Sequence, residues 1–171
     1  MVIMVMGLPG SGKSYFAFRL AELLHAQYIS SDRIRMDKLL NRTYSDREKE
    51  FIYDEMLKEM DKAMHDQKDV VLDATFYTNK LREKFKERVY HTGTLAFIEI
   101  RASEAVIKNR LIHRREFSEA DFEIYNKIKN QWESISEEHL TLESAQGNLH
   151  IMLQKAIRYL YTLKNEKQTD Q

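Results

Sequence analysis

The residues with the clearest chemical pattern lie near the N-terminus, in a glycine-rich stretch that fits G-x-x-x-x-G-K-[ST]. In order they are Gly7, Leu8, Pro9, Gly10, Ser11, Gly12, Lys13 and Ser14. Glycines let several backbone N–H groups converge on one anion, and the N-terminus of a following helix adds its positive dipole. Lys13 supplies a cation for the β- and γ-phosphates, and the Ser14 hydroxyl can coordinate Mg²⁺. The loop therefore predicts binding of a nucleoside triphosphate.

The segments on either side of this loop favour that interpretation over an ordinary glycine-rich turn. Residues 2–6 form a short apolar run without charge, which is typical of a buried parallel strand. After the loop, apolar side chains recur at helical spacing at Phe16, Leu20, Leu23 and Leu24. The loop is thus expected to join a buried strand to an amphipathic helix.

Three further groups could act on a bound phosphate. Asp32 follows an apolar segment and has Arg35 three residues later, and Asp73 lies in a second apolar run. The third group is a cluster of arginines, Arg110, Arg114 and Arg115. Phosphoryl transfer needs a metal ion, cations on the transferring group and a residue that orients or deprotonates the nucleophile. A carboxylate can be that base or can hold the metal, and arginines on a movable segment can neutralise the phosphate.

Each of these groups also has a purely structural interpretation. Asp32 could cap the helix that follows it, since aspartate is common at that position. Asp73 could simply end a strand, and the arginines could form a solvated charged face. The six histidines are scattered without the spacing of metal ligands.

Composition limits the partners and the compartment. The chain has 171 residues, which is the size of one domain, and 27 Lys and Arg residues balance 27 Asp and Glu residues. Zero net charge argues against a broad electrostatic grip on long nucleic acid, although a small basic site remains compatible with it. No segment approaches the roughly 20 apolar residues of a membrane span. We see no signal peptide and no cysteine, so we expect a cytoplasmic protein with no membrane association.

The elements that must position these residues alternate between strands and helices. Five apolar segments are expected as strands, at residues 2–6, 28–32, 69–75, 94–100 and 139–142. Ser45 and Glu48 form a capping box at the start of a helix, and a last helix is expected over about residues 149–163. This alternation predicts an α/β fold with a parallel sheet, whose site lies at the carboxyl ends of the strands.

The combination of the loop, Asp32-x-x-Arg35, Asp73-Ala74-Thr75 and Arg110-x-x-x-Arg114 resembles the P-loop kinases of the polynucleotide 5′-kinase type. It is also similar to the wider group of small P-loop kinases that includes zeta-toxin-like and chloramphenicol-phosphotransferase-like proteins. The resemblance covers residues 1–163 and implies a P-loop three-layer sandwich with a five-stranded parallel sheet of order 2-3-1-4-5. It further implies a lid at about residues 108–118, and it leaves residues 164–171 as a polar tail.

The same resemblance implies roles for individual residues. Asp32 would be the general base for the acceptor hydroxyl, Arg35 would contact the acceptor's phosphate, and Arg114 would contact the transferring phosphate. The catalytic set is therefore Lys13, Asp32, Arg35 and Arg114. The nucleotide-binding set is Gly7, Leu8, Pro9, Gly10, Ser11, Gly12, Lys13, Ser14, Tyr15, Arg110 and Arg114. The metal-binding set is Ser14, Asp32 and Asp73. Phe76 departs from the family, which often has asparagine at that position.

ATP and Mg²⁺ are the implied cofactors, and three functions are compatible with the sequence. The leading hypothesis is transfer of the γ-phosphate to a polynucleotide 5′-hydroxyl, and the alternative is a small acceptor such as a metabolite, sugar or antibiotic. The third is a slow ATPase switch that acts through a protein partner, for which the sequence offers no sign. The nucleic-acid hypothesis gains some support from a basic run that we expect to be mostly solvated, Lys80, Arg82, Lys84, Lys86 and Arg88. Bases could stack on Tyr44, Phe76 or Tyr77.

Overall fold

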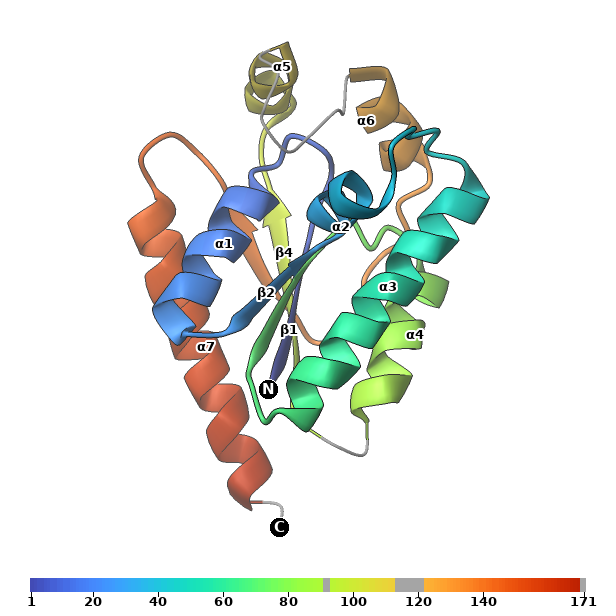
Figure 1. Ribbon diagram of the computed structural model, residues 1–171. Helices are drawn as coiled ribbons and strands as arrows, with labels where there is room; N and C mark the ends of the chain where they lie inside the picture. Colours follow the sequence, from blue (N-terminus) through green and yellow to red (C-terminus); the bar gives the residue numbers. More distant parts are fainter. Residues whose placement is uncertain (91–92, 113–121, 170–171) are drawn as a thin grey trace.

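A single parallel sheet organises the protein, and the computed structural model describes residues 1–90, 93–112 and 122–169 (Figure 1). Its five strands have the order β2-β3-β1-β4-β5, and every neighbouring pair is parallel. The strands are β1 (Val2–Met6), β2 (Gln27–Ser30), β3 (Val70–Asp73), β4 (Leu95–Arg101) and β5 (Leu140–Glu143). The expected α/β fold and the expected strand order are both confirmed.

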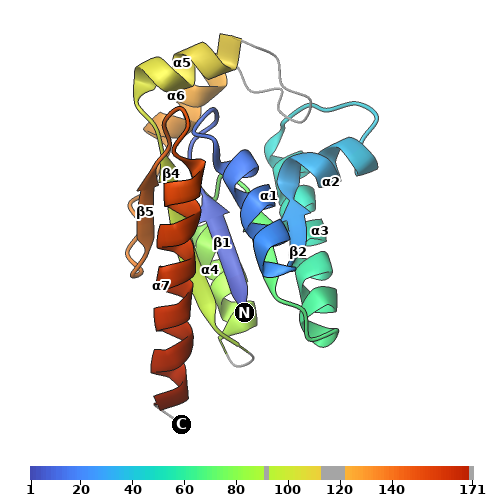
Figure 2. The ribbon, with the colours of Figure 1, turned by 90° about the vertical axis from the view of Figure 1, so that its left-hand side faces the viewer.

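Helices cover both faces of this sheet and its carboxyl edge. They are α1 (Lys13–Leu24), α2 (Ser31–Lys38), α3 (Asp46–His65), α4 (Asn79–Val89), α5 (Glu104–Ile112), α6 (Phe122–Asn130) and α7 (Leu149–Thr169). Figures 1 and 2 show α1 and α7 on one face, and α3 and α4 on the other. The three remaining helices, α2, α5 and α6, lie at the end of the sheet toward which the strands run. The result is a three-layer sandwich whose carboxyl edge, where a site is expected, is flanked by these three helices. No helix among the described residues is long and apolar enough to cross a membrane.

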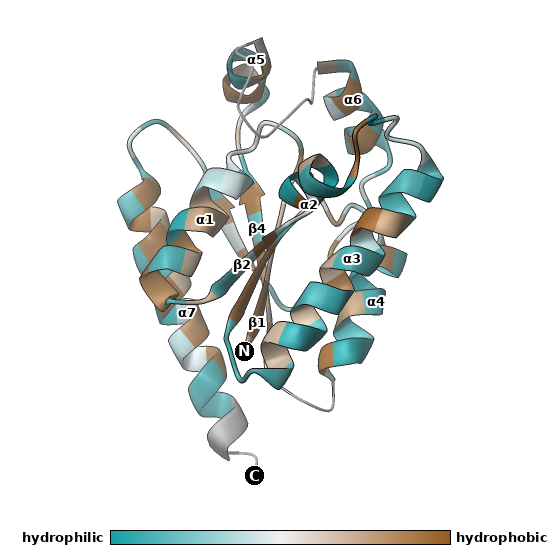
Figure 3. Cartoon of the chain, in the orientation of Figure 1, coloured by the Kyte–Doolittle hydropathy of each residue, from teal (hydrophilic) through white to brown (hydrophobic). Residues whose placement is uncertain are grey.

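The central strand β1 is buried along its whole length because it is covered on both faces and paired on both sides. Val5 is in register with Asp73 of β3 on one side and with Ile98 of β4 on the other. Alternate residues of β1 enter two separate cores, one beneath α3 and α4 and one beneath α1 and α7. Figure 3 shows the corresponding band of hydrophobic residues along the strands. A run of apolar residues without charge is what such a strand requires.

Several element boundaries differ from the sequence-based expectation. β2 ends at Ser30, so Asp32 lies in the first turn of α2 rather than at the end of the strand. α7 continues to Thr169, six residues beyond the expected end at residue 163. α6 ends at Asn130, although helical spacing of apolar residues predicts a helix through residue 135, from Phe122, Tyr125, Ile128, Trp132 and Ile135. The expected lid lies partly outside the described residues, and Arg114 and Arg115 lie wholly outside them.

The chain that follows the end of α6 contacts a buried arginine, Arg82, which we expected from the sequence to be solvated. Arg82 is only 1% exposed. Its Nη1 donates to the Phe76 carbonyl (2.7 Å), and its Nη2 donates to the carbonyls of Glu133 (2.9 Å) and Ser134 (3.0 Å). The interpretation of Arg82 as a solvated residue was wrong, because α4 places it on the same buried side as Phe85 and Val89. Its guanidinium thus donates hydrogen bonds to carbonyl groups of the chain after α6, which no longer have helical partners.

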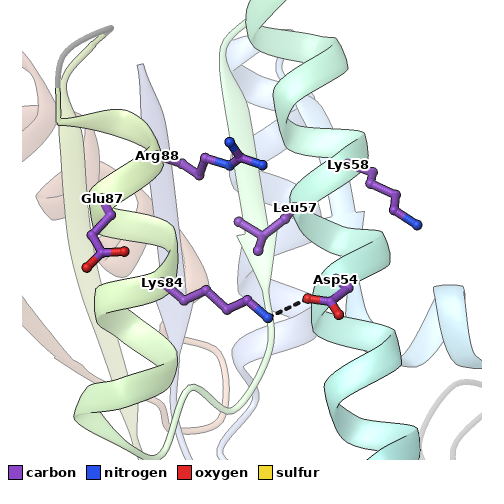
Figure 4. A pocket seen from close by; sticks show the side chains of 6 residues that line it. All are labelled: Asp54, Leu57, Lys58, Lys84, Glu87 and Arg88. Atoms are coloured by element: carbon purple, nitrogen blue, oxygen red, sulfur yellow. Dashed lines mark hydrogen bonds and ion pairs between the residues drawn. The ribbon is translucent and has the colours of Figure 1, made fainter.

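Three other cations of this basic run pair with carboxylates on the surface, namely Lys84, Lys86 and Arg88. A groove between α3 and α4 is lined by Asp54, Leu57, Lys58, Lys84, Glu87 and Arg88 (Figure 4). Lys84 bonds Asp54 across this groove, and Arg88 Nη2 lies 3.3 Å from the carboxylate of Asp61. Lys86 likewise bonds Glu137 at 3.0 Å. Four of the five cations in the run are therefore buried or paired, so the run is not a continuous positively charged stripe.

Replacing Arg82 should destabilise the fold much more than replacing an exposed cation of the same helix. Arg82→Met removes the donors for three backbone carbonyls, and we expect a loss of about 3 kcal/mol in the free energy of unfolding. Lys84→Met, which removes an exposed ion pair, should cost less than about 1 kcal/mol. Urea denaturation at pH 7 measures both values. Equal losses in the two variants would contradict the role assigned to Arg82.

Candidate active site

The glycine-rich loop between β1 and α1 has the backbone shape that its sequence predicts. Gly12, with φ of 96°, is the N-cap of α1, and Gly7 has φ of 151°. A Cβ atom at Gly7 would lie 2.4 Å from the carbonyl oxygen of Ile100, so only glycine fits between the loop and β4. Lys13 and Ser14 open α1, and Tyr15 is an exposed residue of its first turn. Backbone N–H groups of the loop and the N-terminus of α1 thus lie together, as an anion-binding site requires.

Arg110, expected at the nucleotide, lies against this loop. Its Nη1 donates to the carbonyl of Ser11 at 2.8 Å, and its Nη2 donates to Ser144 Oγ at 3.1 Å. Ser144 belongs to the loop between β5 and α7, and a Cβ at Gly12 would lie 2.8 Å from its hydroxyl. Sequence reasoning missed Ser144, because a serine in a polar loop carries no signal of its own. The structure thus brings α5, the loop after β5 and the phosphate-binding loop together.

Asp32 and Arg35 are adjacent, as their spacing on one helix implies, but Arg35 is held more firmly than expected. The Arg35 side chain is buried, and its Nη1 donates to Asp32 Oδ1 at 3.0 Å. Its Nε donates to Glu48 Oε1 at 2.9 Å, and its guanidinium lies 4.7 Å from the centre of the Tyr44 ring. The Asp32 side chain remains 31% exposed. Arg35 therefore fixes a partly exposed carboxylate from the buried side.

Glu48 is a second residue that sequence reasoning undervalued. It was expected only as part of a capping box, and Ser45 Oγ does accept from the Glu48 N–H at 3.3 Å. Its carboxylate additionally accepts from the backbone N–H groups of Thr43 (2.6 Å) and Tyr44 (2.9 Å). Burial alone would raise the pKa of Glu48, but these bonds and the Arg35 guanidinium outweigh it and lower that pKa. Glu48 thus ties the chain before α3 to the helix that carries Asp32.

Asp73 ends β3 directly beside β1 and is almost completely buried, at 2% exposure. Its Oδ2 accepts a hydrogen bond from the Tyr28 hydroxyl at 2.6 Å. Its Oδ1 is buried and has no hydrogen-bond partner among the described residues. Burial and the neighbouring Asp73 charge raise the pKa of Tyr28 well above its usual value, so this hydroxyl remains a donor. Tyr28 was not among the expected site residues.

The oxygen donors near the loop fit Mg²⁺. Ser14 follows the loop lysine, and Asp73 is in register with Val5, two residues before the loop begins. Within the described ranges, no three His, Cys, Asp or Glu side chains group as metal ligands. Magnesium in nucleotide sites needs no such group, because one or two protein oxygens, water and phosphates complete its shell. The orphaned Oδ1 of Asp73 is what such a site would use. Asp32, the third expected ligand, instead has its Oδ1 bonded to Arg35.

Two aromatic residues suggested for stacking nucleobases, Phe76 and Tyr44, lie in different surroundings from each other. Phe76 is fully buried and packs edge-on against Phe85, with ring centres 5.1 Å apart. The suggestion that Phe76 contacts a base was wrong, because its side chain packs in the core beneath α3 and α4. Tyr44 lies over the guanidinium of Arg35.

Comparison with known families agrees with this geometry. Residues 2–135, which contain the loop, Asp32, Asp73 and Arg110, match the family described as AAA domain. The chain belongs to this AAA-domain family. Among curated proteins, none matches the sequence.

Solved structures place this AAA domain within the P-loop kinase fold. A gluconokinase from Sinorhizobium meliloti 1021 is 23% identical with a TM-score of 0.72, covering 99% of this chain and 96% of its own. The Mycobacterium tuberculosis APS kinase CysC in complex with AMPPNP and APS is 14% identical with a TM-score of 0.70, covering 94% and 96%. A chain of the Pnkp1/Rnl/Hen1 RNA repair complex is 19% identical with a TM-score of 0.63, covering 76% of this chain and 43% of its own.

Glu48 should make the stability of the protein depend on acid pH. Its pKa is lower in the folded than in the unfolded chain, so its contribution is complete above the unfolded value. That contribution is lost as the pH falls through the folded pKa. At pH 7, the free energy of unfolding of Glu48→Gln should be about 1–3 kcal/mol lower than that of wild type. This difference in the free energy of unfolding should narrow below about pH 4.

Urea titrations of wild type and Glu48→Gln between pH 7 and pH 3 measure this gap. The matched control is Glu22→Gln, which alters an exposed pair with Arg19 and should leave the pH profile unchanged. A gap that stays constant over the whole range would contradict the assigned network.

Proposed function

We propose that this protein is an ATP-dependent phosphotransferase that moves the γ-phosphate to an acceptor hydroxyl. The observation that carries the proposal is the position of Asp32, a partly exposed carboxylate at the carboxyl edge of the sheet that also bears the phosphate-binding loop. A nucleotide-binding protein that only senses ATP has no need of such a fixed carboxylate. General-base catalysis needs one within reach of the hydroxyl proton.

In this proposal, residues of the chain bind the phosphates, support the loop and accept the proton. The loop N–H groups and Lys13 hold the β- and γ-phosphates, and Arg110 supports the loop from the side of α5. Ser14 and Asp73 would hold Mg²⁺, which would supply neutralisation of the phosphate charge. As the acceptor oxygen bonds to the γ-phosphorus and the bond to the ADP oxygen breaks, Asp32 takes the hydroxyl proton. Arg114, outside the described residues, keeps its proposed role at the transferring phosphate.

The acceptor we favour is a small hydroxylated molecule rather than a polynucleotide. Arg35, which would contact the phosphate of a nucleic-acid acceptor, is bonded to two carboxylates. Four of the five cations of α4 are buried or paired, Phe76 is buried, and the net charge is zero. Likeness to the gluconokinase and the APS kinase also extends over nearly the whole of both chains.

A polynucleotide 5′-hydroxyl remains the second candidate. Its support is the Asp32-x-x-Arg35 element, together with the likeness to a chain of an RNA repair complex over 76% of this protein. The two candidates share all the chemistry and differ only in the size and charge of the acceptor.

A transfer screen separates the acceptor classes. The purified protein with Mg²⁺ and γ-labelled ATP is offered sugars and sugar acids, nucleosides, aminoglycosides and 5′-hydroxyl oligonucleotides of RNA and DNA. We expect label on a compound of the small classes and background labelling of the oligonucleotides. Efficient labelling of an oligonucleotide end, with none on the small compounds, would replace the favoured acceptor with the second one.

Replacing Asp32 with asparagine should separate transfer from binding. Asp32→Asn keeps the side-chain shape and removes its basicity, so ATP affinity should change little. Transfer to the acceptor found in the screen should fall by roughly 10²-fold or more, the scale of general-base catalysis. The N-cap of α2 is Ser30, so the structural alternative for Asp32 is only its hydrogen bond with Arg35 in the first turn of the helix. If Asp32 has that role alone, the asparagine oxygen can still accept this bond and transfer stays at the wild-type rate.

The control for this variant is Asp37→Asn, an exposed carboxylate on the same helix. It should leave both ATP affinity and transfer unchanged. Wild-type transfer by Asp32→Asn would remove the base assignment, and Asp73 would be the next carboxylate to test.

A further inference from the structure

Tyr28 lies where three elements around the phosphate-binding loop meet. It belongs to β2, and its hydroxyl donates to Asp73 Oδ2 of β3 at 2.6 Å. Its ring meets Phe18 of α1 edge-on, with ring centres 5.6 Å apart, and Phe18 lies one helical turn after Ser14. The guanidinium of Arg33, the neighbour of Asp32, stacks on the Tyr28 ring at 4.8 Å. The ring is thus held from two sides while its hydroxyl holds the carboxylate.

The sheet register explains how a tyrosine reaches this carboxylate. Tyr28 is opposite Val71, and Asp73 lies two residues further along β3. Side chains two residues apart on a strand point to the same face, which here is the face covered by α1. The diagonal separation of about 7–8 Å between such positions suits a long side chain with a terminal hydroxyl. A shorter polar residue at position 28 would not span it.

This single bond leaves the Asp73 carboxylate with two unlike oxygens. Oδ2 is bonded to Tyr28, whereas Oδ1 is buried without a hydrogen-bond partner among the described residues. A buried carboxylate oxygen without a partner is costly, so its retention calls for a ligand that completes it. The nearby loop, Ser14 and the expected phosphates make a hard cation the fitting ligand.

We propose that Tyr28 is a positioning residue for Mg²⁺-dependent nucleotide binding, because its hydroxyl fixes Asp73 so that Oδ1 is presented to the metal. This inference rests on the proposed nucleotide site and adds a residue to it. Partners that orient a metal-binding carboxylate typically change metal affinity by 10–100-fold when removed. Tyr28 would thereby adjust how strongly the protein prefers the magnesium complex over the free nucleotide.

The test compares binding of AMPPNP in Mg²⁺ with its binding in EDTA, by calorimetry. Tyr28→Phe removes the hydroxyl and keeps the ring that contacts Phe18 and Arg33. We expect binding in Mg²⁺ to weaken by about tenfold and binding in EDTA to stay unchanged. Tyr159→Phe is the matched control and should affect neither value, because Tyr159 lies in α7 and its hydroxyl donates to the backbone carbonyl of Glu138.

Each other outcome has a distinct meaning. Equal weakening with and without Mg²⁺ would show that Tyr28 only supports packing, and unchanged binding in Mg²⁺ would show that its hydroxyl is dispensable; either overturns the inference. If wild type itself binds AMPPNP no better with Mg²⁺ than in EDTA, the proposed nucleotide chemistry fails as well.

A double variant keeps the test available if Tyr28→Phe does not fold alone. Tyr28→Phe combined with Asp73→Asn leaves no buried carboxylate unpaired. If Tyr28 acts through Asp73, this double variant binds AMPPNP in Mg²⁺ as Asp73→Asn does. A further tenfold loss in the double variant would mean that Tyr28 acts independently of Asp73, which contradicts the inference.

Discussion

The constraint on which the site depends is the parallel pairing of β1 with both β3 and β4. A parallel sheet brings the carboxyl ends of its strands to one edge, and here that edge carries the glycine loop, Asp73 and, across β2, Asp32. Burial favours this pairing, because β1 is covered on both faces and a charged side chain along it would be buried without a partner, at a high cost in free energy. Gly7 then becomes obligatory, because β4 approaches the loop closely at Ile100. The fold and the phosphate site are therefore specified by the same strand.

Around that edge the protein uses hydrogen bonds from buried or partly buried side chains to hold the groups that would do chemistry. Arg35 is fixed between Asp32 and Glu48, and Glu48 is fixed in turn by the chain that leads into α3. Asp73 is fixed by Tyr28, and Arg82 secures the chain after α6 on the far face. The first of these arrangements leaves the Asp32 carboxylate partly exposed, and the second leaves one oxygen of Asp73 without a hydrogen-bond partner among the described residues. Such preorganisation is what catalysis by positioning requires.

The sequence could predict the parts of the site that are local in the chain. The loop, the Asp32-x-x-Arg35 pair and the strand order follow from contiguous patterns and from resemblance to a known group. The roles of four residues could not be predicted, because these bonds join them to partners that lie 13 to 51 residues away in the sequence. The four are Tyr28, Glu48, Arg82 and Ser144. Arg82 shows the reason most clearly: its charge resembles its solvated neighbours until the fold places carbonyls around it. The extension of α7 was missed for a different reason, since a polar sequence can continue a helix already docked on the sheet.

The measurement that tests the central claim most directly is the fate of the γ-phosphate in a single turnover. Enzyme in excess over γ-labelled ATP and Mg²⁺ is quenched with and without the acceptor, and labelled acceptor is separated from inorganic phosphate. The account predicts that acceptor accelerates ATP consumption and that most of the label is then found on its hydroxyl. Consumption at one rate in both reactions, with all the label released as inorganic phosphate, would contradict it and identify a nucleotide hydrolase that acts as a switch.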